Sequence, residues 1–312
     1  MAEFKPKPRV LILGVSGFLG YTLALQLRKK FSVAGIYFGN PIYIPDVQVF
    51  PVNIANLDII EHIVRIQEPE FTIMAAGVND RSYCKEHPKL SENFNVVMPV
   101  NFAIAANKTK AKNIHLSCAD MYESNDGNYK EDDINFTLDD EYGKDKQTAE
   151  SYIKSQTMEC TIIRVGRIMG LGHPHRHSLF DNIRIPLSSG ESITAAKTLV
   201  HSYLGARTFA QGIERVLSEP IPMKHRTFHM GGVASSEFDF AQTLCKVLGY
   251  NEKLVKPLGS DPSPLNYSLS SDTFIETYPR WSPDDKAALF GYLYECLRPG
   301  LPFIPPKTLP AP

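Results

Sequence analysis

The stretch VLILGVSGFLG, residues 10–20, decides the fold. Its first four residues are apolar and predict a buried strand, and the glycine turn that follows opens an amphipathic helix. Gly14 permits the tight turn, Gly17 lets backbone N–H groups approach a pyrophosphate, and Gly20 allows the helix to pack closely on the strand. A strand, a glycine turn and a helix in this order therefore predict a binding site for a dinucleotide.

Apolar runs alternate with amphipathic stretches from residue 9 to residue 117. This rhythm is typical of parallel strands that are connected by crossover helices. Strands are predicted at 10–13, 33–37, 47–52, 71–76, 113–117 and 161–165, and helices near 19–27, 59–64 and 90–107. The pattern predicts the α/β class, with a Rossmann-type doubly wound parallel sheet and a smaller C-terminal α/β substrate domain.

The rhythm loosens after residue 160, where loops are predicted over a Ser/Gly/Thr-rich stretch near 188–198. Helices are predicted at 204–218, 236–248 and 283–297, the last with Ser282 as its N-cap and Pro283 in its first turn. We expect a dinucleotide-binding Rossmann domain over residues 1–165, to which some later segments return. A substrate-binding portion over 166–300 and a proline-rich tail over 301–312 complete the predicted organisation.

Charge and hydropathy exclude several classes of partner. The 33 basic and 34 acidic residues nearly cancel, and no long run of either sign could grip a phosphate backbone. The start, MAEFKPKPRV, carries two prolines and mixed charge where a secretory signal needs an apolar run. No later window approaches the roughly 20 apolar residues of a membrane span. We expect no nucleic-acid partner and no membrane partner.

Five cysteines are far apart in the sequence and form no CxxC pair: Cys84, Cys118, Cys160, Cys245 and Cys296. This spacing suggests neither a disulfide framework nor a zinc site. His173, His175 and His177 lack a nearby carboxylate or cysteine as a fourth ligand, so no metal is predicted there either. We expect a cytoplasmic protein.

The sequence EYGKDK, residues 141–146, places Tyr142 and Lys146 on one face of a helix. A free phenol has a pKa of about 10, and a neighbouring ammonium favours its ionised form. With this pair the chain resembles the extended short-chain dehydrogenase/reductase superfamily, and within it the dTDP-4-dehydrorhamnose reductases. The resemblance is carried by GVSGFLG (14–20), FTIMAAGVN (71–79), LSCADMY (116–122), YKEDD (129–133) and RVGRIMG (164–170).

The resemblance implies reduction of a nucleotide-linked 4-keto sugar by NADP or NAD. Tyr142 is then the acid and base that exchanges a proton with the carbonyl oxygen, while Lys146 tunes the phenol and holds ribose hydroxyls. The implied coenzyme contacts are Gly14, Ser16, Gly17, Phe18, Leu19, Gly20, Asn53, Ile54, Ala75, Ala76, Gly77, Asn95, Tyr142, Lys146 and Arg167. A guanidinium at Arg167 or Arg207 could clasp a diphosphate, or form a plain ion pair.

The end of the second predicted strand bears on the choice of coenzyme. An acidic residue there would bind a ribose 2′-hydroxyl and select NAD, but the chain has Tyr37, Phe38, Gly39 and Asn40. No carboxylate repels a 2′-phosphate and no adjacent arginine attracts it, so the sequence favours NADP only slightly. Asn53 stands where the family usually has an aspartate near the adenine, which keeps a hydrogen-bonding side chain and removes a charge.

The third catalytic position of such enzymes is a serine or threonine that polarises the carbonyl. Here it falls on Cys118, and Ser117 precedes it on the opposite face of the strand. A thiol is a weak donor. Three readings therefore stay open: Cys118 serves, the register slips so that Ser117 serves, or the protein binds a dinucleotide without rapid turnover.

Two rival functions follow from the same resemblance. A nucleotide-sugar epimerase is one, and a dehydratase is disfavoured because Cys118, Ala119 and Asp120 replace the usual adjacent carboxylate pair. A non-catalytic, dinucleotide-binding regulatory subunit is the other. The superfamily also implies a homodimer through a pair of helices, although no apolar stripe in the sequence marks that surface.

Overall fold

The computed structural model describes residues 6–52, 57–123, 126–134, 136, 140–157, 159–173, 176–219, 226–259 and 264–299. The chain forms two compact units. Unit 1 comprises Met1–Met121, Phe136–Arg164 and Ala210–Phe228. Unit 2 comprises Tyr122–Asn135, Val165–Phe209 and His229–Pro312.

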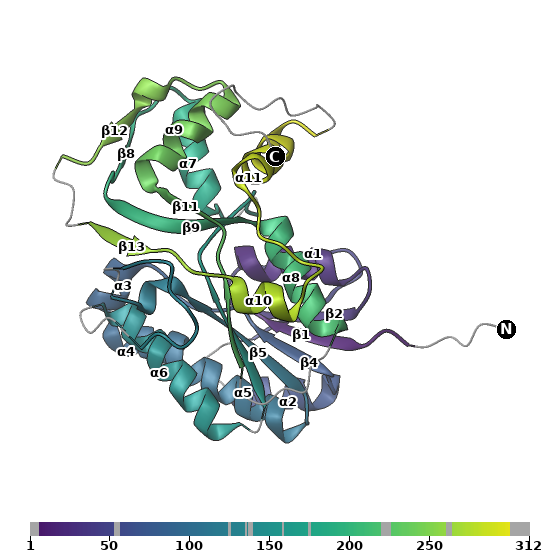
Figure 1. Ribbon diagram of the computed structural model, residues 1–312. Helices are drawn as coiled ribbons and strands as arrows, with labels where there is room; N and C mark the ends of the chain where they lie inside the picture. The colour runs from purple at the N-terminus through teal and green to yellow at the C-terminus, as the bar shows by residue number, and fades with distance from the viewer. Residues whose placement is uncertain are drawn as a thin grey trace. The chain divides into compact units, whose positions relative to one another are not determined.

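Unit 1 contains a sheet of seven strands (Figure 1), in the order β10-β6-β5-β4-β1-β2-β3. Its strands are β1 (Arg9–Leu13), β2 (Ser32–Tyr37), β3 (Gln48–Pro51), β4 (Phe71–Met74), β5 (Lys112–Cys118), β6 (Cys160–Val165) and β10 (Arg226–Met230). β1 pairs in parallel with both β2 and β4, so that Leu13 lies beside Ile36 and Met74. Because the strand order reverses between β1 and β4, the carboxyl ends of these strands form the switch point where such sheets bind ligands. The doubly wound Rossmann-type sheet is confirmed.

Helices cover both faces of this sheet, with α2, α5 and α6 on one side and α1 on the other (Figure 1). They are α1 (Phe18–Leu27), α2 (Leu57–Gln67), α3 (Arg81–Glu86), α4 (Pro88–Glu92), α5 (Met98–Lys108) and α6 (Glu141–Gln156). A π-helical turn, η1 (Asn93–Val97), joins α4 to α5, and a short 3-10 turn, η2 (Ala119–Met121), follows β5. Each of the predicted strands and helices of this half is present within a few residues of its expected limits.

One part of the core of unit 1 lies between the sheet and the α2 and α5 helices. Leu11 and Leu13 of β1 pack with Val64 and Phe102 in one buried cluster. The apolar faces that the sequence pattern predicted are therefore the ones that fix the sheet beneath its carboxyl edge, since burying each such side chain contributes about 1.5–3 kcal/mol.

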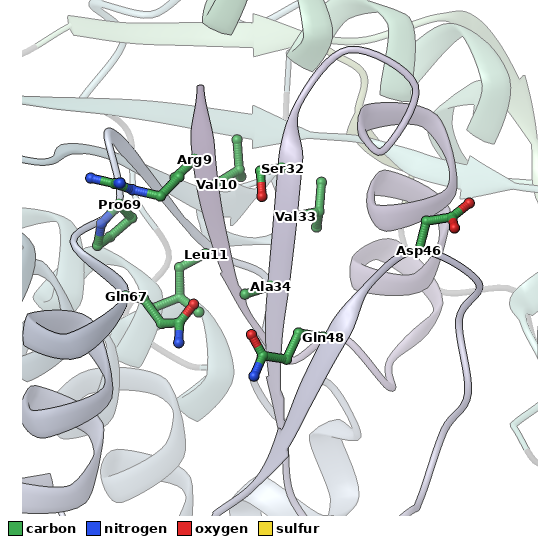
Figure 2. Close-up of a pocket in the computed structure, with 10 residues that line it drawn as sticks. All are labelled: Arg9, Val10, Leu11, Ser32, Val33, Ala34, Asp46, Gln48, Gln67 and Pro69. Carbon is green, nitrogen blue, oxygen red and sulfur yellow. The ribbon is translucent and has the colours of Figure 1, made fainter. Parts of the chain in front are cut away.

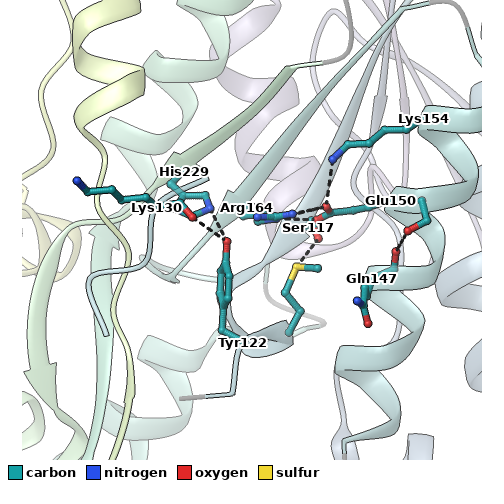
Figure 3. Close-up of polar contacts among 10 residues, drawn as sticks. Ser117, Tyr122, Lys130, Gln147, Glu150, Lys154, Arg164 and His229 are labelled. Carbon is teal, nitrogen blue, oxygen red and sulfur yellow. Dashed lines mark hydrogen bonds and ion pairs between the residues drawn. The ribbon is translucent and has the colours of Figure 1, made fainter. Parts of the chain in front are cut away.

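A buried ion pair fixes α6 to β6 (Figure 3). Arg164 donates from Nη2 and Nε to the Glu150 carboxylate at 2.7 and 3.0 Å, and both side chains are only 4% exposed. Two parallel hydrogen bonds of this kind also fix the orientation of the two groups. The helix that carries Tyr142 and Lys146 is therefore held in one rotational position on the sheet.

Unit 2 contains a four-stranded sheet and a two-stranded sheet. The four strands are β7 (Arg167–Met169), β9 (Leu199–Gly205), β11 (Val233–Ser236) and β13 (Leu265–Tyr267), and the two are β8 (Ile193–Ala195) and β12 (Val255–Pro257). The helices are α7 (Leu179–Ser188), α8 (Ala206–Ser218), α9 (Glu237–Leu248), α10 (Asp272–Thr277) and α11 (Lys286–Leu297), with a 3-10 turn η3 (Glu252–Leu254). α8 begins in unit 2 and ends in unit 1. Tyr203 stacks on Phe240 at the centre of this unit's core, with ring centroids 3.9 Å apart.

Two local predictions need correction. The N-cap of α11 is Asp285, whose carboxylate accepts from Ala288 N at 2.8 Å, and not Ser282. The stretch 188–198, predicted as loops, contains the short strand β8. The prolines of the tail at 301–312 lie outside the described residues. Every helix within the described ranges is too short or too polar to span a bilayer.

Candidate active site

The glycine turn lies between β1 and α1, where the sequence predicts it. Gly14 has a φ of +94°, and a Cβ there would lie 2.6 Å from the backbone nitrogen of Ala76. A Cβ on Gly20 would collide with the Gly14 carbonyl oxygen. Only glycine fits either position, because the loop after β4 and the turn of α1 are packed directly against this backbone.

The N-terminus of α1 has the properties of an anion site. Its N-cap is Gly17, no side chain caps it, and its first turn, which contains Phe18, Leu19 and Gly20, holds no acidic residue. The first backbone N–H groups of such a helix are directed outward with a partial positive charge. The residues present therefore fit a diphosphate. Ser16 lies in the turn itself, while Asn53 and Ile54 lie outside the described residues.

The backbone after β4 forms a second part of this edge. Ala75 donates its N–H to the Leu13 carbonyl at 2.9 Å, and a Cβ on Gly77 would lie 2.9 Å from Oδ1 of Asn95. Asn95, which is fully buried in the π turn η1, exchanges hydrogen bonds of 3.0 and 2.9 Å with the backbone of Val78. This amide therefore fixes the backbone of the loop at Val78, directly after Gly77.

Cys118 ends β5 and packs against Tyr142 of α6, together with Cys84. Ser117 is directed elsewhere, with its hydroxyl 3.9 Å from the Met121 sulfur. Of the two side chains that the sequence left open, the thiol of Cys118 is thus the one beside the phenol. The packing of Cys84 here is not predicted by the sequence, because α3 reaches this point only in the folded chain.

Burial keeps both groups protonated. The pKa of Tyr142 is raised well above its ordinary value by burial, by the charge of the neighbouring Cys118 and Asp120, and by a hydrogen bond with Cys118. Burial also raises the pKa of the Cys118 thiol to about 12, Asp120 acting in the same direction and Lys146 in the opposite one. At neutral pH the site therefore presents a phenol O–H and a thiol S–H.

Lys146 lies one turn after Tyr142 and is 5% exposed. Its Nζ is 5.9 Å from the centroid of the Tyr142 ring and donates to the carbonyl oxygen of Leu116 at 3.2 Å. Burial lowers the pKa of this ammonium, while the negative charges of Glu150 and Asp145 favour it. Tyr142 and Lys146 are thus two buried side chains on one face of α6, as the sequence predicted.

A hydrogen-bonded group of α4, η1 and α6 supports this face. Ser91 donates to Asp145 at 2.5 Å, and Asn95 Nδ2 donates to the Ser91 hydroxyl at 3.2 Å. The buried Asp145 directly precedes Lys146 in the chain. Ser91 and Asp145 were not predicted from the sequence, although the four-residue spacing of Ser91 and Asn95 on one helix face could have indicated Ser91.

His115 lies in β5 and is fully buried. Within the described part of the chain, neither of its ring nitrogens has a hydrogen-bond partner. Burial, and secondarily the charge of Lys146, lowers the pKa of this imidazole well below its ordinary value. A neutral histidine therefore lies in the strand that carries Cys118, and no pattern in the sequence indicates it.

Arg167, predicted to contact the coenzyme, lies in unit 2 at the start of β7. Its Nη2 is 2.9 Å from Nε2 of His201 and 3.8 Å from the Glu237 carboxylate. Arg167 thus forms the plain ion pair that the sequence left open as the alternative to a diphosphate contact. His201 also stacks on Tyr267, with centroids 5.3 Å apart. The other candidate, Arg207, lies 3.1 Å from the Glu295 carboxylate.

A cavity of about 160 Å³ lies elsewhere in unit 1 (Figure 2). Its lining residues are Arg9, Val10, Leu11, Ser32, Val33, Ala34, Asp46, Gln48, Gln67 and Pro69. They include the amino ends of β1 and β2, whereas the glycine turn, Ala75 and Cys118 follow the carboxyl ends of their strands. The cavity is therefore at the opposite end of the sheet from the Tyr142 site. Among the described residues, no group of three or more His, Cys, Asp or Glu side chains could hold a metal ion.

A Rossmann sheet with a glycine turn, and with a Tyr–Lys pair on one helix beside the end of β5, defines an extended short-chain dehydrogenase/reductase. The chain belongs to the RmlD substrate binding domain family, whose model matches residues 8–275. The resemblance predicted from the sequence is confirmed.

Individual relatives are distant. The probable low-salt glycan biosynthesis reductase Agl14 of Haloferax volcanii is 22% identical over 259 residues, 78% of this chain and 82% of that protein. Methionine adenosyltransferase 2 subunit beta of Bos taurus is 24% identical over 166 residues, 53% of this chain and 48% of that protein. The structure of a dTDP-4-dehydrorhamnose reductase from Bacillus anthracis strain Ames in complex with NADP has a TM-score of 0.74 and 17% identity, and the match covers 87% of this chain and 93% of that one. At this identity the structural likeness shows the fold alone.

Proposed function

We propose that this protein is an NAD(P)-dependent reductase of a nucleotide-linked 4-keto sugar. The observation that carries the proposal is the pair formed by the buried Tyr142 phenol and the Lys146 ammonium on one face of α6, in the same unit as an uncapped glycine turn. Family membership and the reductases among its relatives support the reaction class. The substrate class is drawn from the dTDP-4-dehydrorhamnose reductases that share the fold.

The residues present fit a nicotinamide dinucleotide. The amides of the α1 N-terminus would hold its diphosphate, the backbone from Ala75 to Gly77 would lie along it, and Lys146 would hold ribose hydroxyls. When bound, the coenzyme supplies the hydride. Phe38 and its neighbours after β2 provide no carboxylate against a 2′-phosphate, which favours NADP slightly.

Tyr142 supplies the proton in this proposal. Because burial raises its pKa, the phenol stays protonated at neutral pH and can donate to the carbonyl oxygen as that oxygen becomes negative. Cys118, which is also protonated, is the second donor to that oxygen. The weak donor strength of a thiol makes this second interaction weaker than a hydroxyl would.

The test uses the purified protein, NADPH or NADH, and a panel of nucleotide 4-keto sugars. We expect oxidation of the coenzyme with at least one sugar, and we expect Tyr142→Phe to lower kcat by about 10²–10⁴-fold without changing coenzyme affinity. Tyr152→Phe is the matched control, because Tyr152 is on the same helix and 52% exposed.

The alternative is a regulatory subunit, which the similarity to methionine adenosyltransferase 2 subunit beta and the presence of Cys118 both favour. Coenzyme binding without turnover of any sugar, equally strong in Tyr142→Phe, would support that alternative and overturn the reductase. Interconversion of sugar epimers without net oxidation of the coenzyme would instead indicate an epimerase.

A further inference from the structure

Arg81, the first residue of α3, bridges two carboxylates beside the Tyr142 site. Its Nη2 is 3.2 Å from Oδ1 of Asp120, and its Nε is 3.7 Å from Oδ2 of Asp140. Asp120 lies in the turn η2, and Asp140 is the N-cap of α6. One guanidinium therefore connects three elements that are far apart in sequence.

Each of these carboxylates is close in the chain to a group of the site. Asp140 accepts a hydrogen bond from Gly143 N at 3.0 Å, which fixes the first turn of α6 and with it Tyr142. Asp120 follows Cys118 by two residues. The bridge of Arg81 thus joins the start of the helix that carries the phenol to the turn that follows the thiol.

Titratable and charged groups from four elements lie around the phenol and the thiol. The groups are Arg81 and Cys84 from α3, Cys118 from β5, Asp120 from η2, and Asp140 and Lys146 from α6. Asp120 acts to raise the pKa values of both Tyr142 and Cys118, after the larger effect of burial. Its side chain is 24% exposed, so water screens this charge only in part. A cation on Asp120 opposes the same effect.

We propose that Arg81 is a positioning residue of the site, which joins the turn η2 to the start of α6 and balances the charge of Asp120 and Asp140 beside the Tyr142 phenol and the Cys118 thiol. The part that concerns catalysis rests on the proposed function; the electrostatic part does not. Without the guanidinium, the charges of Asp120 and Asp140 would lose their shared partner, and among the groups named above Lys146 would be the remaining cation.

The first test needs neither coenzyme nor sugar. It measures how fast methyl methanethiosulfonate modifies Cys118, by mass spectrometry of the peptide, in the wild-type protein, Arg81→Gln, Arg81→Lys, Asp120→Asn and the Arg81→Gln/Asp120→Asn double variant. The reagent reacts with the thiolate, and one pKa unit changes the thiolate fraction tenfold. We expect modification about tenfold slower in Arg81→Gln, about tenfold faster in Asp120→Asn, and near the wild-type rate in the double variant and in Arg81→Lys.

The second test measures kcat/KM for sugar reduction against pH with the same proteins. Reduction needs the protonated phenol, so its rate falls as pH rises through the pKa of Tyr142. The pH at which kcat/KM falls should be higher in Arg81→Gln than in the wild-type protein and lower in Asp120→Asn. In the double variant it should be close to the wild-type value. A merely structural role would lower the rate at every pH and would not shift the pH at which kcat/KM falls.

Equal modification rates in Arg81→Gln, Asp120→Asn and the wild-type protein, with melting temperatures showing that all are folded, would overturn the inference. So would a double variant that stays as slow as Arg81→Gln. If the modification rates change as expected but no sugar is reduced, the inference stands and the proposed function fails, so the two failures are distinguishable.

Discussion

At the scale of single residues, Cys118 is the main departure from the expected site. Its thiol lies beside Tyr142, where the family resemblance implies a hydroxyl, and burial raises the pKa of this thiol to about 12, which keeps it protonated at neutral pH. An S–H group is a weaker donor than an O–H group. In the proposed reductase, Cys118 would therefore polarise the carbonyl more weakly than a serine or threonine would.

Replacing this sulfur by oxygen should improve the reaction. We expect Cys118→Ser to raise kcat for sugar reduction about fivefold, because one neutral hydrogen bond contributes about 1 kcal/mol. Steady-state kinetics with NADPH and the nucleotide 4-keto sugar measure the change. Cys296→Ser, a half-buried thiol of unit 2, is the control and should change nothing. A lower kcat in Cys118→Ser would show that the site is adapted to sulfur.

Part of the site was predictable from single residues and part was not. Gly14, Cys118, Tyr142 and Lys146 are recognisable because each belongs to a short motif with fixed spacing. Arg81 belongs to none, since its carboxylate partners lie 39 and 59 residues away in the chain, at Asp120 and Asp140. Only the folded chain brings such charges together.

At the scale of elements, the start of α11 shows how a local rule can select the wrong residue. The sequence Ser282-Pro283-Asp284-Asp285 offers three capping side chains. Asp284 is engaged elsewhere, accepting from Gly205 N at 2.7 Å and Thr208 Oγ1 at 2.6 Å. That contact holds residue 284 outside the helix, so the cap falls on Asp285.

The cap can be measured directly. We expect Asp285→Ala to lower the free energy of unfolding by about 1 kcal/mol, because the N–H of Ala288 loses its acceptor. Ser282→Ala is the matched control, and its effect should stay within about 0.5 kcal/mol. Urea unfolding of both variants gives the two values. Equal losses would contradict the assignment of the cap.

Element length decided which parts of the fold were predictable. The long apolar runs of β1, β2 and β5 were read correctly because alternating or continuous burial leaves a clear pattern. β7, β8, β12 and β13 have three residues each, which is too few to show any period. These short strands form because they pair with other strands of the folded chain, and the local sequence does not indicate that pairing.

At the scale of the whole molecule, His115 links stability to pH. The folded-state pKa of this imidazole lies well below the ordinary value of about 6.5. Below pH 6.5, His115 therefore binds a proton in the unfolded chain but stays neutral in the folded chain. The stability that depends on the neutral imidazole is fully present above that pH and is lost progressively as the pH falls toward the folded-state pKa.

The loss attributable to this residue between pH 7.5 and 5.5 should be about 1.4 kcal/mol. Urea unfolding at the two pH values measures it, and His115→Leu should reduce the pH dependence by that amount. An unchanged pH dependence in His115→Leu would assign the acid sensitivity to other groups.

The π turn η1 carries one residue more per turn than the α-helices on either side of it. It therefore rotates α5 relative to α4 by about 100°. Ser91 and Asn95 can then face α6 and the Val78 loop while Phe102 still enters the core. A homologue that lacks this extra residue could either direct Ser91 and Asn95 toward α6 and the Val78 loop or direct Phe102 into the core, but it could not do both. Segment length, more than residue identity, is thus the criterion for deciding which homologues possess an equivalent of Asn95.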